Sequence, residues 1–323
     1  MKLHIAFIFL LLGVYCQAQA PEQMKQIKKL KHVLFYQADW ETAENELNKY
    51  IEEAGADTTS YHYAALLLLD AQLQYEKGDY RLALAKTKNT IALTKKQNFH
   101  SLLANCLGFR AYILTEFGKL NTAEKLLEVA LKEYQNRKDT LSLDFAKITF
   151  YRAKLKQEQN SYHAADSLFR ISLQLAEKDS LLQVLVLNGY IVSKLEQEDW
   201  ENVLNNLNQV KKIASEYLAS NHPYALYVDY LTARYFISNG QYKEGASVNT
   251  NLLKRSHQVL GKIHPLITLF LHQKAFLNLE NANYSVAEQI LLKIKELRLL
   301  IYGENYKYAS ILNYLGECYT KMG

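Results

Sequence analysis

Apolar residues recur at helical spacing along almost the whole chain. One clear run is Leu120, Ala123, Leu127, Ala130, Leu131 and Tyr134, whose members share one face of a helix. The stretches between such runs are short, and three of them carry a glycine at the expected turn, at Gly78, Gly118 and Gly240. The pattern predicts helices joined by tight turns, without strands.

The helical pattern repeats every 38 to 42 residues. The residue expected to open each second helix is aromatic in six of seven repeats: Trp40, Tyr80, Leu120, Tyr162, Trp200, Tyr242 and Tyr284. Three residues further on stands a mostly small residue: Ala43, Ala83, Ala123, Ala165, Val203, Gly245 and Ala287. Small residues at a fixed place let paired helices approach closely. The pattern therefore predicts about seven helical hairpins, followed by a single last helix over 304–322.

Helix starts carry signals of their own. The residue before the second helix is a good N-cap in five repeats, because its side-chain oxygen can accept a backbone N–H: Asp39, Asp79, Ser161, Asp199 and Asn283. Pro223 and Pro265 are 42 residues apart and each follows a histidine. Proline is favoured at the first position of a helix, so both are expected to open first helices.

Composition supports an all-α fold and narrows the function classes. Glycine (12) and proline (3) together make under 5% of the 323 residues, against about 12% in average proteins, which favours long helices. A net charge of +5 is too small for a nucleic-acid-binding footprint. Three cysteines are too few for a disulfide scaffold, and we expect Cys106 and Cys318 to be buried, unpaired thiols.

The first residues predict export. A basic residue and ten almost unbroken apolar residues are typical of a signal peptide over 1–18, cut after Ala18 or after Ala20. The apolar run is too short to span a bilayer, which needs about 20 residues. A lipoprotein anchored at Cys16 and a cytosolic N-terminal helix are the alternatives. The solenoid is expected over 21–323, with no membrane span after signal removal, in the periplasm, at the surface or outside a bacterium.

The repeat resembles the tetratricopeptide repeat. Its Leu-Gly-x-x-Tyr signature and the glycine that follows stand in the last stretch as Leu315, Gly316, Tyr319 and Gly323. The repeat is longer than the usual 34 residues, as in HEAT or armadillo repeats, but the Gly-x-aromatic-x-x-Ala turn argues against these families. The 42-residue subtype of kinesin light chain and bacterial arrays carries Leu-Gly-x-x-His-Pro at the repeat junction, which is matched by Leu260, Gly261, His264 and Pro265.

Candidate chemistry is sparse. The chain has no P-loop, no Gly-x-Gly-x-x-Gly, no His-Glu-x-x-His and no Cys-x-x-Cys motif. His222 and His264 stand at the same place in successive repeats, which favours helix capping or packing over a metal site. Cys106 has no catalytic motif around it. We therefore expect no enzyme, no cofactor and no bound metal.

The resemblance implies a right-handed α-solenoid whose concave groove, formed by the first helix of each repeat, holds an extended peptide or a helix of a partner protein. Alignment of the repeats gives these groove candidates: Lys147, Phe150, Lys154, Asn188, Tyr227, Tyr230, Arg234, His272 and Phe276. Asparagine and basic side chains can bond a peptide backbone or carboxylate, and aromatic side chains supply apolar contact area.

Two hypotheses for the function remain. The first is an exported, non-enzymatic protein–protein interaction scaffold. The second is the sensing or docking front of a larger protein, because similar arrays precede CHAT-type caspase-like proteases or membrane-anchored signalling regulators. The last helix supports the second hypothesis in one respect, since it has the pattern of an internal repeat rather than a polar cap.

Overall fold

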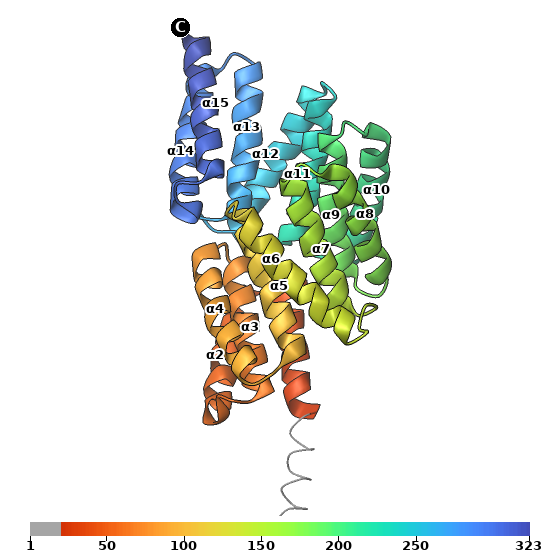
Figure 1. Cartoon of the computed structure of the whole chain (residues 1–323). Coiled ribbons are helices and arrows are strands. Elements are labelled where there is room, and N and C mark those ends of the chain that lie inside the picture. Colours follow the sequence, from red (N-terminus) through yellow and green to blue (C-terminus); the bar gives the residue numbers. More distant parts are fainter. Residues whose placement is uncertain (1–20) are drawn as a thin grey trace, which may run out of the picture.

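The computed structural model describes residues 21–323, and this part of the chain is helical throughout, without strands. Residues 21–31 form a helix that continues into the π-helix η1. In chain order the elements are η1 (His32–Gln37), α2 (Trp40–Ala54), η2 (Gly55–Asp57), α3 (Tyr61–Glu76), α4 (Tyr80–Lys96), α5 (His100–Glu116), α6 (Leu120–Asn136), α7 (Leu143–Glu158), α8 (Tyr162–Leu175), α9 (Ser180–Glu196), α10 (Trp200–Tyr217), α11 (Pro223–Ser238), α12 (Tyr242–Val259), α13 (Pro265–Glu280), α14 (Tyr284–Tyr302) and α15 (Tyr306–Met322). The predicted all-α solenoid of hairpins is confirmed (Figure 1).

Every second helix begins at the residue that the repeat pattern indicates, from Trp40 in α2 to Tyr284 in α14. The small residue three positions later is buried in all seven repeats. At Gly245 an added Cβ would lie 2.6 Å from Ile237 Cγ1, so no larger residue fits there without movement. The small position therefore sets how closely the two helices of each hairpin approach.

The turn of each hairpin uses one left-handed residue, two positions before the second helix. Glycine occupies it in three repeats, at Gly78, Gly118 and Gly240, with φ between 72° and 87°. The other four repeats place Ala38, Asn160, Glu198 and Ala282 there, with φ between 52° and 58°. The turn geometry is thus kept where glycine is absent, although L residues pay about 1–2 kcal/mol for this conformation.

The expected caps of the second helices are only partly present. The carboxylates of Asp39 and Asp79 accept the backbone N–H three residues on, at 3.1 and 2.9 Å. Ser161, Asp199 and Asn283 make no such bond, and the Asp199 carboxylate binds side chains instead. Side-chain caps are more regular at the first helices, where they come from Ser60, Ser142, Asp179, His222, His264 and Asn305.

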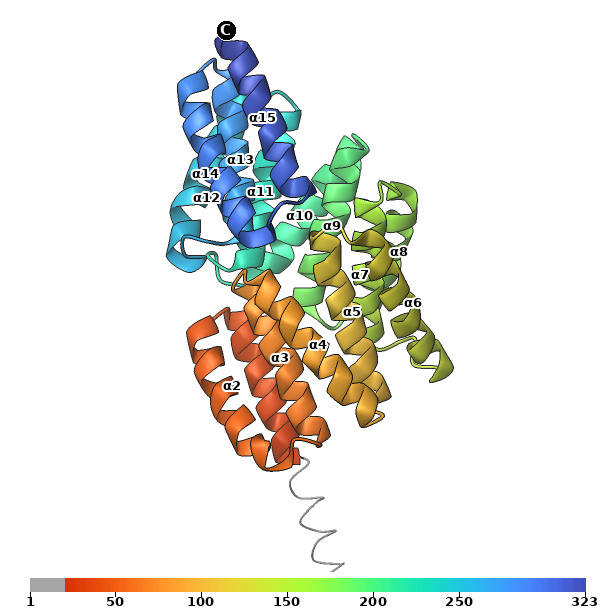
Figure 2. The same ribbon diagram turned by 60° about the vertical axis from the view of Figure 1, so that its left-hand side comes forward.

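The superhelix turns back on itself, so that its last repeats lie against its first (Figures 1 and 2). In both views the blue helices α13–α15 stand at the ends of the orange helices α3 and α4. Two histidines tie these parts together: His222 Nε2 is 2.9 Å from the carbonyl oxygen of Phe35, and His264 Nε2 is 3.0 Å from that of Glu76. Each Nδ1 accepts the backbone N–H two residues on, at 3.2 and 3.1 Å. The expected capping role is confirmed, and each neutral ring also closes the superhelix.

The remaining expectations of this kind concern thiols, metals and membranes. Cys106 and Cys318 are free and buried, as predicted. Within residues 21–323, no helix is long and apolar enough to cross a bilayer. The same residues contain no group of three or more histidine, cysteine or acidic side chains placed to hold a metal ion. The predicted signal peptide lies outside the described residues.

Candidate functional site

A cavity of about 360 Å³ lies inside the closed superhelix, where the first and last repeats meet. Its walls come mainly from the first helices α3, α5, α7, α9, α11 and α13, with Tyr80 of α4 and the junction of α14 and α15. The first helices thus form the inner face of the array. The contacts between the first and last repeats narrow the groove to a cavity that remains partly open to solvent.

Four glutamates stand at one register in successive repeats, each four residues before the second helix begins, and we call them the glutamate column: Glu76, Glu116, Glu158 and Glu196. All four carboxylates are engaged by residues of other helices. The Tyr224 hydroxyl donates to Glu76 Oε1 at 2.5 Å, across 148 residues of sequence. Arg234 Nη2 lies 2.6 Å from Glu196 Oε1. The N-terminal and C-terminal ends of α11 thus each contact one carboxylate of the column.

The other two carboxylates hold the start of α15. Lys307 Nζ is 2.5 Å from Glu116 Oε2, and the Tyr306 hydroxyl donates to Glu158 Oε2 at 2.9 Å. Burial disfavours the charge on both members of the ion pair. Their mutual attraction is stronger, and it lowers the pKa of Glu116 and raises that of Lys307. Both groups are therefore charged at neutral pH, and the pair acts as a latch between α5 and α15.

Glu76 lies in an aromatic corner of the cavity. The rings of Tyr75 and Tyr112 are tilted relative to each other, with centroids 5.3 Å apart, and the Tyr224 hydroxyl contacts the carboxylate. No lysine, arginine or histidine forms an ion pair with Glu76 among the described residues. Burial raises the pKa of Glu76 to about 7, although the hydrogen bond from Tyr224 opposes the rise. This carboxyl therefore takes up a proton at a higher pH than an exposed glutamate does.

The opposite end of the cavity is basic. Arg298 is only 7% exposed, and its Nη1 donates to the carbonyl oxygen of Lys307 at 2.7 Å and to Ser310 Oγ at 2.8 Å. Its Nε has no partner, and no carboxylate pairs with it in residues 21–323. Burial, and then the charges of Arg298 and Arg234, lower the pKa of His272 to about 4. The two guanidinium groups therefore act on one region, in which Arg234 is paired with Glu196 and Arg298 has no carboxylate partner among residues 21–323.

Asn188 of α9 is one of the residues that line the cavity, and its side chain has no hydrogen-bond partner in the described part of the chain. Its side chain is 3% exposed, and neither Nδ2 nor Oδ1 has a partner in the part of the chain described. Each buried polar atom left unpaired costs about 1–3 kcal/mol. A buried amide with both atoms free is uncommon in folded proteins, so this position calls for a functional explanation.

Six of the nine sequence-predicted groove residues line the cavity: Phe150, Lys154, Asn188, Tyr227, Tyr230 and Arg234. Lys147, His272 and Phe276 do not line it. Phe150 and Tyr230 are only 3% and 9% exposed and pack in the core, because the closed superhelix covers the groove. As partner-binding residues, all nine remain predictions.

Sequence reasoning missed the glutamate column and its partners. The column has a signal in the sequence, since its members are spaced by 40, 42 and 38 residues like the repeat itself. Arg298 and Lys307 have no such signal. Their place in the cavity depends on how the repeats turn relative to one another, and one repeat alone does not contain this information.

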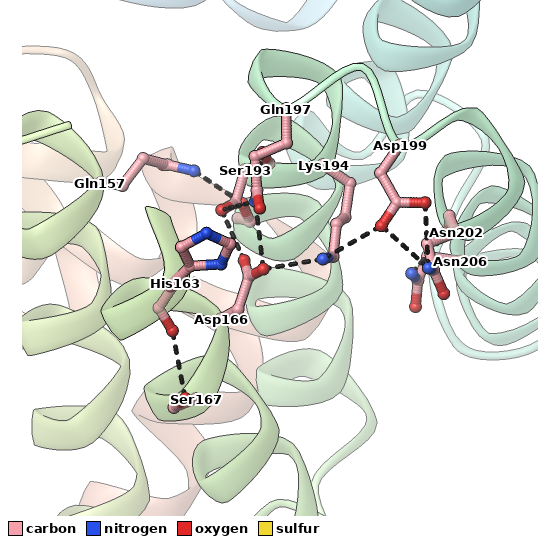
Figure 3. Close-up of polar contacts among 11 residues, drawn as sticks. Gln157, His163, Asp166, Ser167, Ser193, Lys194, Gln197, Asp199, Asn202 and Asn206 are labelled. Carbon is pink, nitrogen blue, oxygen red and sulfur yellow. Dashed lines mark hydrogen bonds and ion pairs between the residues drawn. The ribbon is translucent and has the colours of Figure 1, made fainter. Parts of the chain in front are cut away.

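A second polar cluster has residue types that can support chemistry but lies outside the cavity wall (Figure 3). Asp166 accepts from Ser193 Oγ at 2.6 Å, from Lys194 Nζ at 2.8 Å and from Gln197 Nε2 at 3.0 Å. Lys194 also reaches Asp199 at 3.2 Å. The bonds join α8, α9 and the start of α10, and they leave the serine hydroxyl tied to a carboxylate in the core. The cluster therefore cross-links two repeats.

Comparison with known structures identifies the architecture. A Rap protein in complex with competence and sporulation factor superposes with a TM-score of 0.60 at 12% identity, covering 94% of this chain and 99% of that one. A tetratricopeptide repeat protein from Parabacteroides merdae gives 0.53 at 15% identity, with coverages of 91% and 99%. The fold is a tetratricopeptide-repeat solenoid.

A putative kinesin light chain from Podosopora anserina with tetratricopeptide-like repeats scores 0.46 at 18% identity, covering 62% of this chain and 96% of that one. This similarity is too low to support the light-chain-like subtype, which stays a prediction. No family model and no curated protein matches the sequence. The similarity to solved structures concerns the tetratricopeptide fold alone.

Proposed function

We propose that this tetratricopeptide-repeat protein is a non-enzymatic interaction protein that holds an extended peptide inside its closed superhelix. The observation that carries the proposal is the unpartnered, buried amide of Asn188 in the cavity wall. An asparagine side chain offers one acceptor and two donor hydrogens, which match the N–H and C=O groups of a peptide backbone. A bound peptide would pair the atoms that the empty protein leaves unpaired.

The free amide of Asn188 favours an extended chain over a partner helix. A helix pairs its own backbone N–H and C=O groups, whereas an extended chain leaves them free to bond an asparagine side chain. Tyr227 and Tyr230, one turn apart on α11, offer apolar area with polar tips beside the bound chain.

The Rap protein structure supports the proposal by analogy of fold, since that solenoid was found in complex with a factor. The satisfied cluster around Asp166 and the buried, high-pKa thiol of Cys106 both favour a binding role over catalysis.

Selection from a random twelve-residue peptide library on the purified full chain tests the proposal. We expect enriched sequences that bind the wild type and bind Asn188→Leu at least tenfold more weakly. Because leucine removes a buried, unpaired amide, the melting temperature of this variant should not fall. Asn121→Leu, at an exposed position on α6, is the matched control and should bind like the wild type. Absence of enrichment, or equal binding to Asn188→Leu, contradicts the proposal.

Export belongs to the same proposal. We expect a leader to be removed after Ala18 or Ala20, which places the solenoid in the periplasm, at the cell surface or outside the cell. N-terminal sequencing of the protein recovered from bacterial fractions checks this expectation. An intact Met1 contradicts export, and a lipid-modified Cys16 identifies a lipoprotein instead.

The second hypothesis, a docking front of a larger CHAT-type protease or signalling regulator, also stays a prediction. The exposed side chains of Leu312, Tyr319 and Met322 on α15 resemble an internal repeat and support it. The coding DNA that follows codon 323 distinguishes the two, because an output domain in the same reading frame favours the second hypothesis.

A further inference from the structure

The two ends of the cavity carry opposite charges that the protein itself leaves uncompensated. At one end, the Glu76 carboxylate has a hydrogen bond from Tyr224 and no cationic partner among the described residues. At the other, Arg298 is buried with a free Nε and no carboxylate partner in residues 21–323. Buried charges are normally paired because isolation from water is costly. The cavity is therefore bipolar, with a negative aromatic corner and a positive corner.

The distance between these two corners can be estimated along helix α11. Tyr224, which bonds Glu76, and Arg234, which with Arg298 acts on His272, are ten residues apart on this helix. At about 1.5 Å per residue the two positions lie about 15 Å apart along the helix axis. An extended peptide advances about 3.3–3.6 Å per residue, so about four residues span that length.

Resting on the proposed function, we propose that the cavity selects a short peptide of about four residues with two free termini. Its ammonium group lies on Glu76, its backbone on Asn188, and its terminal carboxylate beside Arg298 and Arg234. The ligand class is thus a short zwitterionic peptide, distinct from an internal segment of a folded partner.

Each end of such a ligand meets the groups that its charge requires. The ammonium group neutralises Glu76 and lies beside the side chains of Tyr75 and Tyr112, which also line the cavity. The carboxylate pairs with the guanidinium of Arg298, whose Nε–H has no partner within the described chain. Both contacts lie in a cavity that is partly screened from solvent, where electrostatic attraction is stronger than in bulk water.

The test uses the full chain and a random tetrapeptide mixture with free termini. Peptides retained with the protein on ultrafiltration are identified by mass spectrometry. The best of them is synthesised again in four forms: with both termini free, N-acetylated, C-amidated and doubly blocked. Isothermal titration then gives Kd for each form. We expect each single block to weaken binding at least tenfold, equivalent to about 1.4 kcal/mol.

Variants assign the two ends. Glu76→Gln, which keeps a hydrogen-bond acceptor for Tyr224, should bind free and N-acetylated peptides equally while still discriminating against the amide. Arg298→Gln should lose discrimination against the amide only. Glu128→Gln and Arg170→Gln, at exposed positions on α6 and α8, are the controls and should keep both preferences. If Arg298→Gln does not fold, the affinities of the wild type for the free and C-amidated peptides still test whether the terminal carboxylate is bound.

The outcomes separate this inference from the proposed function. If dodecapeptides are enriched while no tetrapeptide is retained, or if blocked and free forms bind equally, the zwitterionic ligand is wrong and peptide binding stands. If neither library yields a ligand, the proposed function falls and the inference falls with it.

Discussion

Neutralising Glu116 by the substitution Glu116→Gln should loosen the closed superhelix at a defined cost. The ion pair with Lys307 is 2.5 Å long, and its side chains are only 16% and 21% exposed. Removing one partner of a buried pair costs about 3–5 kcal/mol, because the other charge is left uncompensated. The partial exposure of this pair places the expected loss at the low end, about 3 kcal/mol.

Thermal unfolding followed by circular dichroism measures the effect. For a large domain, 1 kcal/mol shifts the melting temperature by about 2–4 °C, so we expect Glu116→Gln to melt about 6 °C below the wild type. A double-mutant cycle with Lys307→Met isolates the pair. The double variant should be more stable than Glu116→Gln alone, because it no longer buries an unpaired ammonium group.

The control is Glu317→Gln, which breaks the exposed Lys321–Glu317 pair one turn apart on α15. Exposed pairs of this kind contribute about 0.3–0.5 kcal/mol, so its melting temperature should change by about 1 °C or less. Strict additivity of the Glu116→Gln and Lys307→Met effects would refute the latch, as would a Glu116→Gln melting temperature equal to that of the wild type.

Two further predictions probe the closure. Gly118→Ala and Gly240→Ala both place alanine at φ near 72°, which should cost about 1 kcal/mol in urea unfolding. Gly118→Ala should cost at least about 1 kcal/mol more than Gly240→Ala. An added Cβ at Gly118 would lie 2.9 Å from Tyr306 Cδ1, whereas nothing lies within 4 Å of one at Gly240. Equal costs would contradict the contact between the first and last repeats. The pKa of His264 is about 4 in the folded chain, against an ordinary value of 6.5. Between pH 7 and 5 this histidine therefore binds a proton in the unfolded state and stays neutral in the folded state, which lowers the free energy of unfolding by about 2 kcal/mol. Glu76 has the opposite effect, because its pKa is raised to about 7 and it binds a proton in the folded state first, which offsets the loss. In urea titrations, the free energy of unfolding of Glu76→Gln should therefore fall between pH 7 and 5 by about 2 kcal/mol more than that of the wild type. Parallel pH profiles of the two proteins would contradict this assignment.

The hairpins could be predicted from sequence because their determinants are local. An aromatic residue opening the second helix and a small residue three positions later lie in one hairpin, so the starts from Trp40 to Tyr284 follow from spacing alone. The register of the groove residues is equally local, which is why Asn188 and Arg234 do line the cavity. The missing caps at Ser161 and Asn283 show the limit of this reasoning, since a suitable residue type does not fix the orientation of its side chain.

The closure could not be predicted in this way. Its contacts join residues far apart in the sequence, for example 148 positions for Glu76 with Tyr224 and 191 positions for Glu116 with Lys307. Whether these residues meet depends on small rotations between neighbouring hairpins, which add up over several repeats. The burial of Asn188, expected as an open groove position, follows from the same accumulated rotation.

The contacts between the two ends of the array also fix how many hairpins the chain can contain. In an open solenoid, loss of one internal hairpin shortens the array and leaves the other interfaces of the same kind. Here the loss of a hairpin between α5 and α15 would displace Lys307 by one repeat and separate it from Glu116. If the lost hairpin came before α11, Tyr224 would also be separated from Glu76. Duplication of a hairpin would have the same effect in the other direction. Point substitutions within a hairpin should therefore accumulate more readily in descendants of this protein than changes in repeat number.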